Sequence, residues 1–488
     1  MAYEPTIGIE THAQLQTASK MFCRCMVPSS VGRSADERGL VSPNSLVCPV
    51  CLGLPGSLPV INQRAVEYVL MAGLALNCRL AEFSRFDRKN YNYPDLVKGY
   101  QISQFDFPLC RDGWLDIEVD GRAKRIGILD VHLEEDTGKL IHVQGQSWID
   151  FNRSGIPLME VVTAPDFTSV QQVREYVMEL RRILCYLGVN SGNMEEGAMR
   201  FEANVSLHPL GTDTKGTRVE VKNLNSFRAL LRSVEYEIVR QEQVLREGGT
   251  IRRETRGWDD ENGITQVQRS KELADDYRYF PEPDLPPLEI KADWVEQIRA
   301  SMPELPSQRR LRFGAQYGLS AYDVGLLTEE RDVADYFERA VSVAQPCGIG
   351  AKVVANWVTG ELFRLLRAAN VEITASQVSP ERLVELIAQV SSNVITMATG
   401  KQVLQAMFDT GEAASDVVSE QGLGQIADTD RLAKVIEEVI TANPGPVAQY
   451  RGGKETVLRF LVGQVMKSTK GKADPVLTAD LLRSRLSS

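Results

Sequence analysis

The sequence predicts an α+β protein, in which a catalytic domain of mixed sheets is followed by an all-helical domain and a small helical tail. Short runs that alternate apolar and polar residues, as half-buried strands do, dominate the first 290 or so residues. From Asp293 onward the pattern is helical almost throughout. The 488 residues also exceed the roughly 250–300 at which one hydrophobic core stops growing. We therefore expect three domains, over residues 1–292, 293–408 and 409–488.

The clearest strand patterns occupy residues 125–136, 201–209 and 217–223. In the second of these, Phe201, Ala203 and Val205 share one face because strand side chains alternate. Glu202 and Asn204 share the other face. Alternation therefore predicts a sheet with one buried face and one polar face.

Two long helices are expected to interrupt these strands. One runs over residues 169–186, with an N-cap at residue 168 or 169, and ends at Gly188. The other begins near residues 225–226 and ends at Gly248. Four prolines in residues 279–290 predict a stiff connector or edge before the helical part. Further breaks are expected near residues 399–412 and 440–453.

The net charge of −10 argues against a protein that coats nucleic acid without specificity. Residues 451–488 nevertheless carry eight Lys/Arg and three acids, a local charge of +5. This basic end is a candidate phosphate-contacting surface; the alternative is a solvated helical face. No apolar run approaches the roughly 20 residues that span a bilayer, and the N-terminus lacks a signal-peptide layout. A cytoplasmic compartment and no membrane partner are therefore expected.

Four cysteines form two close pairs that suit a metal ion. Cys23 and Cys25 are followed, after a polar linker, by Cys48 and Cys51. Each short loop presents two sulfurs to one ion, which is typical of tetrahedral zinc. Four thiolate ligands leave no open position, so the predicted zinc site is structural. Unrelated free thiols are the alternative.

Acids and histidines cluster in two strand-like segments. In residues 7–12, Glu10 and His12 lie on one face of the predicted strand. In residues 130–139, three consecutive acids follow His132. Carboxylates with an occasional imidazole suit Mg²⁺, which is often shared with substrate phosphates. The plainer interpretation of the acid run is a strand end with solvated carboxylates.

Basic and aromatic residues alternate in the loop over residues 86–106, which contains Arg88, Lys89 and Lys98 among three tyrosines. Such a loop fits phosphates and a stacked base, although an ordinary surface loop explains it equally well. There is no Walker A motif, and no Rossmann fingerprint follows a strand. A nucleotide site would therefore require a different fold.

Several phrases together resemble one family. They are IGIETHAQLQTASKMFC, CPVCLGLPGSLPVIN, FDRKNYNYPDLVKGYQISQFD, HLEEDTGKL, DFNRSGIPLMEVV, GNMEEGAMRFEANVSL, VEVKNLNSFRAL and DDYRYFPEPDLPP, in this order, with FLVGQVMKSTKGKADP near the end. The whole chain resembles the B subunits of the aspartyl/glutamyl-tRNA amidotransferases, which are glutamine-hydrolysing ligases.

This resemblance implies a first domain similar to glutamine synthetase. It also implies a heterotrimer in which the partners are a glutaminase, the A subunit, and a small C subunit. ATP and Mg²⁺ would serve to phosphorylate the side-chain carboxylate of Glu on tRNA(Gln), of Asp on tRNA(Asn), or of both. Ammonia from the glutaminase then displaces the phosphate, giving Gln-tRNA or Asn-tRNA. Phosphorylation is needed because a carboxylate oxygen is a poor leaving group.

The resemblance also implies site residues. The implied Mg²⁺ ligands are Glu10, His12, Glu135 and Glu202, of which the first three are also catalytic candidates. Strand alternation instead places Glu134 on the face of His132, and the choice between Glu134 and Glu135 stays open. The family usually has Cys-Asp-Ala-Asn where this chain has residues 201–204, so Glu202 carries a longer arm than the usual Asp.

Other roles rest on the same resemblance. Lys89 is the catalytic and phosphate-binding candidate, and Lys222 with Asn223 would line the nucleotide cavity. The tail would bind tRNA through Lys467, Lys470 and Lys472. Two other functions remain open: a non-catalytic tRNA-binding scaffold, and a metal-dependent phosphodiesterase that uses the same acids without ATP.

Overall fold

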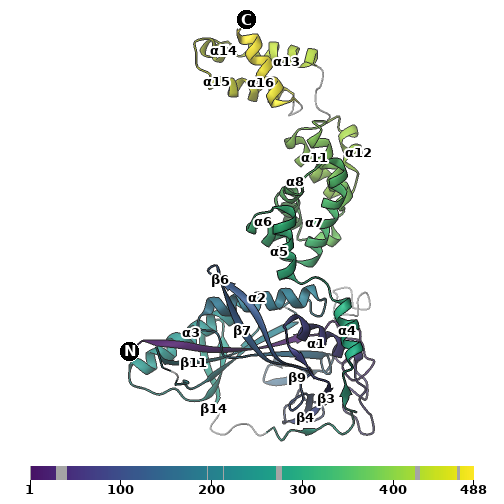
Figure 1. Ribbon diagram of the computed structural model, residues 1–488, viewed down its shortest axis with the longest axis vertical. Coiled ribbons are helices and arrows are strands. Elements are labelled where there is room, and N and C mark those ends of the chain that lie inside the picture. Colours follow the sequence, from purple (N-terminus) through teal and green to yellow (C-terminus); the bar gives the residue numbers. More distant parts are fainter. Residues whose placement is uncertain are drawn as a thin grey trace. The chain divides into compact units, whose positions relative to one another are not determined.

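The structure is a computed structural model that describes residues 2–28, 41–194, 196–212, 214–270, 277–423, 429–469 and 473–487. The chain forms two compact units, Met1–Leu305 and Pro306–Ser488 (Figure 1). Helix α4 (Ala292–Ser301) belongs to the first unit, because its Ile298 is buried in that unit's core. The first unit therefore extends to Leu305, beyond the boundary expected after residue 292, which would have cut through this helix.

A nine-stranded sheet forms the first unit, in the order β14-β13-β12-β11-β1-β10-β7-β6-β2. The long strand β1 (Tyr3–Gln14) pairs antiparallel with β10 and β11, whereas β12 and β13 pair in parallel. The sheet is thus mixed, as expected. The remaining strands are β2 (Arg79–Leu80), β6 (Cys110–Val119), β7 (Arg122–Glu135), β10 (Pro157–Thr163), β11 (Met199–Pro209), β12 (Val219–Leu224), β13 (Glu254–Asp259) and β14 (Ile264–Ser270).

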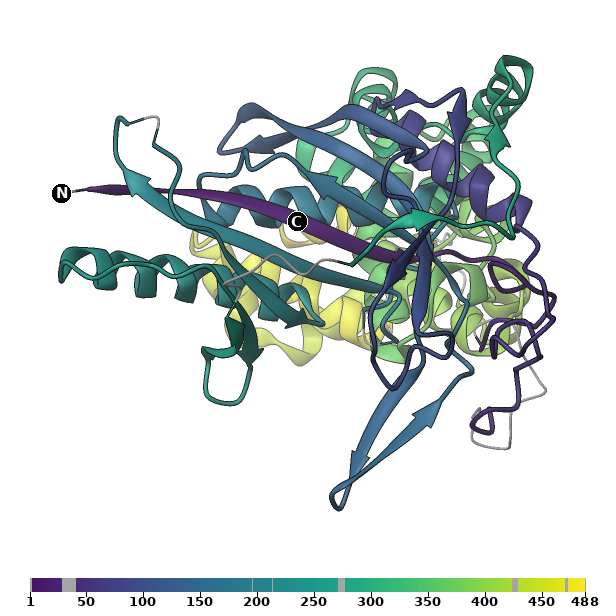
Figure 2. The same cartoon turned by 90° about the horizontal axis from the view of Figure 1, so that it is seen from below.

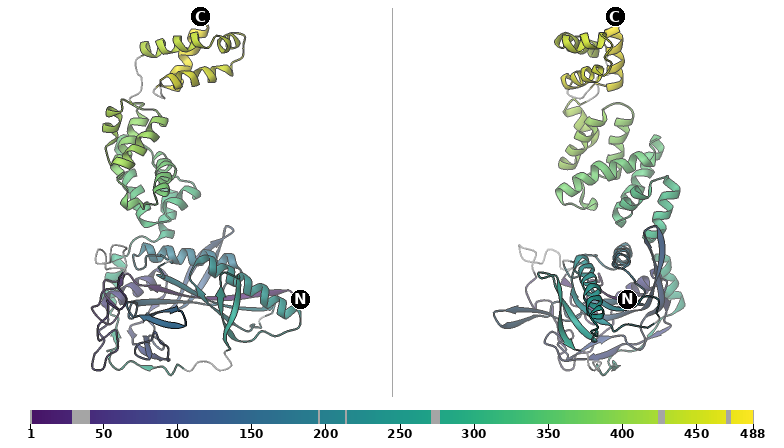
Figure 3. Two further views of the ribbon diagram at one scale, coloured as in Figure 1. Left: turned by 180° about the vertical axis from the view of Figure 1, so that it is seen from behind. Right: turned by 90° about the vertical axis from the view of Figure 1, so that its left-hand side faces the viewer.

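Three helices pack on one face of this sheet: α1 (Gln63–Ala75), α2 (Val170–Tyr186) and α3 (Phe227–Arg246). Figures 1 and 3 show α2 and α3 running along the sheet. The hydroxyls of Ser169 and Ser226 accept hydrogen bonds from backbone N–H groups in the first turns of α2 and α3. Both helices expected from the sequence are therefore confirmed.

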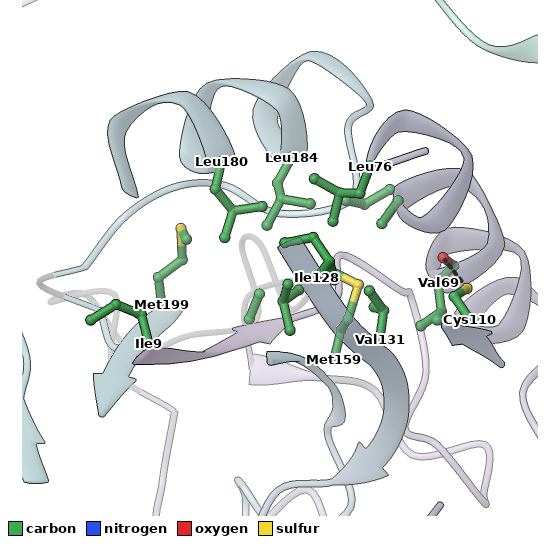
Figure 4. Close-up of a cluster of buried hydrophobic side chains, with 14 of the residues drawn as sticks. Ile9, Val69, Leu76, Cys110, Ile128, Val131, Met159, Leu180, Leu184 and Met199 are labelled. Carbon is green, nitrogen blue, oxygen red and sulfur yellow. Dashed lines mark hydrogen bonds between the residues drawn. The ribbon is translucent and has the colours of Figure 1, made fainter. Parts of the chain in front are cut away.

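The main core lies between the helices and the sheet. Leu180 and Leu184 of α2 point toward Ile128, Val131 and Met159 of the sheet (Figure 4). All five side chains are buried or nearly so. Burying these side chains stabilises the first unit, by about 25 cal/mol for each Å² of apolar surface removed from water.

Strand β12 contains a bulge that changes its alternation. Phe201 of β11 pairs with Leu224, but Ala203 pairs with Val221, so β12 has one residue more than its partner there. Asn223 has a φ of 65°, in the left-handed region that Asn tolerates better than most residues. As a result, Lys222 and Asn223 both lie outside the core while Leu224 is buried.

Smaller sheets surround the main one. Strands β4 (Asp87–Asn90), β5 (Tyr100–Ser103) and β15 (Phe280–Pro281) form one, and β3 (Phe83–Ser84) pairs with β16 (Leu288–Glu289). The proline-rich segment therefore supplies two short strands, β15 and β16. A separate hairpin consists of β8 (Lys139–Val143) and β9 (Gln146–Asp150), and it projects from the unit in Figure 2.

The second unit is helical in its described part, as expected. One hydrophobic cluster joins α5 (Pro306–Tyr317), α6 (Ala321–Leu327), α7 (Arg331–Ala344), α8 (Ala351–Asn356), α9 (Phe363–Ala369), α10 (Pro380–Ser391), α11 (Met397–Thr410) and α12 (Ala414–Glu420). Short helical turns occupy Gln345–Cys347, Trp357–Leu362 and Ile373–Ala375. A second cluster joins α13 (Thr429–Ala442), α14 (Pro444–Arg451), α15 (Val457–Ser468) and α16 (Pro475–Ser487).

The breaks expected near residues 399–412 and 440–453 are wrong, because helices occupy most of these residues. Helix α11 continues to Thr410, and Gly411 ends it with a φ of 75°. Helix α14 fills the second break, because Pro444 stands at its first position, where a missing N–H costs nothing. Among the described residues, no helix combines the length and apolar character needed to cross a membrane.

The packing of α1 on β6 predicts the effect of one substitution. A Cβ atom at Gly73 would lie 2.3 Å from Cys110 Sγ and 3.1 Å from Leu80 Cδ2. We expect Gly73→Ala to destabilise the first unit by about 1–3 kcal/mol through overpacking, seen as a lower thermal unfolding midpoint. Adding Cys110→Ala should recover much of the loss, because it removes the nearest clashing atom. A Gly73→Ala protein as stable as the native one would contradict this contact.

Candidate active site

The face of the large sheet opposite α1, α2 and α3 is polar, and we call it the polar face. In β1, Ile7, Ile9 and Ala13 are buried in the core, whereas Glu10 and His12 are not. This confirms the alternation expected for residues 7–12. A cavity of about 740 Å³ lies over the polar face, and its lining includes His12, Lys89, Glu134, Glu202, Lys222 and Asn223.

The first cluster on the polar face, the His12 group, consists of His12, Glu134 and Glu160. One ligand atom from each lies within 4.8 Å of the others. His12 Nε2 is 3.4 Å from Glu160 Oε2 and 3.9 Å from Glu134 Oε1. His132 flanks the group, with its Nε2 3.1 Å from Glu160 Oε2 and its Nδ1 2.7 Å from Asp130. Three neighbouring strands, β1, β10 and β7, therefore each contribute one side chain to this group.

The second cluster, the Glu10 group, consists of Glu10, Glu202 and Glu220, again with ligand atoms within 4.8 Å of one another. Glu10 and Glu202 face each other across β1 and β11. Lys222 Nζ lies 2.6 Å from Glu202 and 3.3 Å from Glu220. The side-chain amide of Asn204 donates a hydrogen bond to Glu10 at 2.8 Å. Because β1 carries both Glu10 and His12, the two groups are neighbours on one sheet face.

The crowding of charges shifts the pKa values of these side chains. Burial, with the charges of Glu160 and Glu202, raises the pKa of Glu10 to about 7. Burial alone would lower the pKa of His12, but the charge of Glu160 and a hydrogen bond to it outweigh burial and raise that pKa to about 9. Burial and Glu160 likewise raise the pKa of Glu134. The site therefore favours a bound positive charge.

Either group could hold a divalent cation. Each supplies hard oxygen ligands, one with an imidazole as well, and this is a donor set that Mg²⁺ accepts. A cation would also relieve the repulsion that raises the pKa values of Glu10 and Glu134. The donor chemistry and the charge balance thus both fit a metal.

The structure does not bring Glu135 to either group. Its carboxylate forms an ion pair with Lys98 and accepts a hydrogen bond from the backbone N–H of Ile102 at 3.0 Å. Its neighbour Glu134 lies in the His12 group instead. The geometry therefore agrees with strand alternation, and the metal-ligand role implied for Glu135 stays a prediction without a matching contact.

Lys89 lies on β4, at the wall of the cavity. Burial opposes its charge, but Glu134 and Glu160 raise its pKa, so it is a cation beside the His12 group. Its Nζ is 5.0 Å from the centre of the Tyr277 ring, which also lines the cavity. Arg88, in contrast, is held by Glu282 through two hydrogen bonds of 2.7 Å.

Three further charged residues shape the cavity. Asp136 is buried and accepts hydrogen bonds from Arg200 at 2.9 Å and from Gln14 at 2.8 Å. Burial would raise the pKa of Asp136, but Arg200 and Arg153 lower it. Both arginines line the cavity. Asp136 therefore holds the Arg200 guanidinium at the cavity wall, with Arg153 3.8 Å away.

The sequence patterns did not single out Glu160 and Glu220. Glu160 stands between Met159 and Val161 in the apolar run LMEVV, so alternation alone places it on the polar face. Glu220 stands between Val219 and Val221 in the same way. A single acid within an apolar strand was the signal that could have identified both.

The four cysteines predicted to bind zinc come together. Sulfur atoms of Cys23, Cys25, Cys48 and Cys51 all lie within 4.8 Å of one another. The buried Lys20 extends its Nζ to within 3.8 Å of Cys51 Sγ and 3.2 Å of the carbonyl oxygen of Phe151. A hydrogen bond from Cys23 is the main cause that lowers the pKa of Cys51 to about 5. This cluster of four sulfur ligands could hold a metal ion.

The predicted tRNA-binding lysines are only partly described. Lys467 is exposed on α15, whose Leu461 and Val465 pack into the second cluster of the helical unit. Lys470 and Lys472 lie outside the described residues. Their role stays a prediction.

Two family models match the chain, the "GatB/GatE catalytic domain" over residues 5–296 and the "GatB domain" over residues 335–486. A protein of Moorella thermoacetica is 52% identical to this chain over 490 residues, covering 100% of both. Its name is that of the B subunit of an aspartyl/glutamyl-tRNA(Asn/Gln) amidotransferase. The chain belongs to this family.

Other members are almost as similar. Those of Dehalococcoides mccartyi and Roseiflexus castenholzii are 51% and 49% identical, with at least 99% of each chain covered. The catalytic-domain match spans nearly the whole large sheet and both acidic groups. The polar face thus lies within the catalytic domain of this amidotransferase family.

The close contact of His12 with Glu160 predicts how His12 titrates in the metal-free protein. Below a pH of about 9 we expect an imidazolium ion, because Glu160 stabilises the charged form. Glu160→Gln should lower this pKa. The measurement is an NMR pH titration of the protein with labelled histidine, in which only four histidine signals need to be assigned. Glu220→Gln, in the other group, serves as the control and should have little effect. An unchanged pKa in the Glu160→Gln protein would contradict the contact.

Proposed function

We propose that the polar face activates the side-chain carboxylate of Glu or Asp carried on tRNA, by phosphoryl transfer from ATP, for amidation by ammonia. The main support is the pair of neighbouring acidic groups that share β1, with Lys89 beside them. Family membership supports the overall reaction, since the similar proteins are named as subunits of aspartyl/glutamyl-tRNA(Asn/Gln) amidotransferases.

In this proposal Mg²⁺ is held by the His12 group and the Glu10 group, with Glu134 and Glu160 as ligands beside Glu10, His12 and Glu202. Bound Mg²⁺ would neutralise phosphate charge during the transfer. Lys89 would contact the nucleotide phosphates from β4. Lys222 would keep Glu202 and Glu220 in place, through the contacts of 2.6 and 3.3 Å.

The proposed reaction has two steps, transfer of a phosphoryl group to the carboxylate and replacement of the phosphate by ammonia. A carboxylate oxygen of the aminoacyl group attacks the γ-phosphorus of ATP, and ADP leaves with the bonding electron pair. Ammonia then attacks the carbonyl carbon of the phosphorylated side chain, inorganic phosphate leaves, and a proton is lost to give the side-chain amide. The cationic side chains at the cavity wall, Arg153 and Arg200, are placed to stabilise the negative charge of phosphate or carboxylate.

The partners follow from the same proposal. A glutaminase would supply the ammonia as the A subunit, the small C subunit would complete the heterotrimer, and the tail with Lys467 would contact tRNA phosphates. A purely scaffolding role would leave the acidic groups without a task, and a phosphodiesterase would need no ATP. ATP hydrolysis that depends on Glu-tRNA or Asp-tRNA in the reconstituted complex separates these functions.

The two adjacent acids on β7 provide a sharp test. We expect Glu134→Gln to slow ATP-dependent activation by about 100-fold or more, because it removes a ligand from the His12 group. Glu135→Gln should slow this step much less, because Glu135 contacts Lys98 instead. The measurement is the initial rate of ADP release by the reconstituted complex with Glu-tRNA. The reverse order of effects would restore Glu135 as the ligand.

We further propose that the cysteine cluster binds structural zinc. Metal analysis of protein purified without chelator should find one zinc ion per chain. Cys48→Ser should lower the thermal unfolding midpoint, because metal binding contributes to folding in such loops. The matched control is Cys347→Ser, which changes an exposed thiol and should have no such effect. Native protein without zinc would remove the site and leave the proposed reaction unaffected.

A further inference from the structure

The β8–β9 hairpin exposes an apolar surface that its own unit does not cover. The exposed fractions are 62% for Trp148, 43% for Val143 and 38% for Ile141. Ile141 pairs directly with Trp148, and Val143 pairs with Gln146. These side chains therefore lie on the same face of the hairpin. An isolated two-stranded hairpin gains little stability in water, so such a surface indicates a binding role.

The hairpin begins and ends at the wall of the active-site cavity. Thr137 precedes β8, Arg153 follows β9, and both residues line the cavity. Arg153 Nε donates a hydrogen bond to the carbonyl oxygen of Thr137 at 2.9 Å, which ties the two ends together. Figure 2 shows the hairpin projecting from the first unit. The base of the hairpin thus lies at the wall of the cavity.

The charges near the hairpin suit a polyanion. The whole chain has a net charge of −10, yet residues 137–149 contain Lys139 and no acid, and residues 41–52 contain no charge. Asp150, at the base, accepts hydrogen bonds from the backbone N–H groups of Asn44 and Asn152, at 2.9 and 3.0 Å. Its charge is thereby partly satisfied within the protein.

We propose that the β8–β9 hairpin binds the single-stranded 3′ end of the aminoacyl-tRNA, with a nucleobase stacked on Trp148. This inference rests on the proposed function, because the aminoacyl group enters the cavity while attached to the terminal ribose. The bases next to that ribose must then lie close to the cavity entrance, where the hairpin begins. An exposed indole can stack on any base, which suits a 3′ end that does not differ between the two tRNAs.

The turn of the hairpin supports this geometry. Gln144 and Gly145 both have positive φ values, of 50° and 77°, as in the two-residue turns that fit the strand twist. The pairing of Ile141 with Trp148 is thereby fixed. Trp148 Nε1 also lies 3.3 Å from Gln146 Oε1, which restricts the indole. A restricted ring loses less entropy when a base stacks on it.

The test compares two tRNAs and three variants in the purified complex with its partner subunits. Trp148→Ala should weaken binding of intact tRNA by about 5- to 150-fold, the range of one lost base–aromatic stack. Trp148→Phe should retain most of the affinity. A tRNA that lacks its three 3′-terminal nucleotides should bind the native and Trp148→Ala complexes equally. Tyr322→Ala, which removes another exposed aromatic side chain, is the matched control.

A second measurement uses the native complex. Intact tRNA should protect Trp148 from acrylamide quenching, judged against the Trp148→Phe complex, whereas the shortened tRNA should not. Unchanged affinity for intact tRNA, or equal weakening for both tRNAs, would overturn the proposal. Loss of a partner protein from the Trp148→Ala complex would instead identify a protein interface and also overturn it. If the native complex binds tRNA but forms no amide, the proposed function fails, whereas the binding comparison still decides the role of the hairpin.

Discussion

Repulsion between carboxylates on one sheet face is the constraint on which the rest of the site depends. Glu10, Glu202 and Glu220 lie within 4.8 Å of one another, and Glu134 and Glu160 meet in the same way beside His12. Such an arrangement is costly without positive charge. Two histidines, Lys222 and Lys89 supply part of that charge. The negative charge that these groups leave uncompensated is why a divalent cation would suit this surface.

The opposite face of the sheet makes this crowding possible. Three helices bury the apolar half of each strand, so the backbone positions of β1, β7, β10, β11 and β12 are fixed by packing rather than by the polar groups themselves. A rigid frame prevents the acids from moving apart to relieve their repulsion. Packing on one face thus maintains electrostatic repulsion on the other, as is common in enzyme sites.

Much of this arrangement could be predicted from the sequence because it depends on local periodicity. Alternation placed Glu10 with His12, and capping serines located the starts of α2 and α3. The joining of Glu160 with His12 could not be predicted in this way, because it depends on which strands become neighbours. The local pattern of residues 399–412 was also misleading, since Thr and Gly there are accommodated inside α11 by tertiary packing, with Thr399 and Gly400 both buried. The family resemblance supplied the function, whereas the geometry separated Glu134 from Glu135.

The bulge in β12 has a consequence for how this chain can vary. The extra residue shifts the phase of the strand, so Leu224 reaches the core and two consecutive polar side chains face the cavity. Replacing Asn223 with glycine would preserve that phase, since glycine also adopts a positive φ. Deleting a single residue would instead turn Leu224 toward the acidic groups and break the link to the following helix, α3. Over this stretch, the number of residues therefore constrains the fold more than the identity of each residue does.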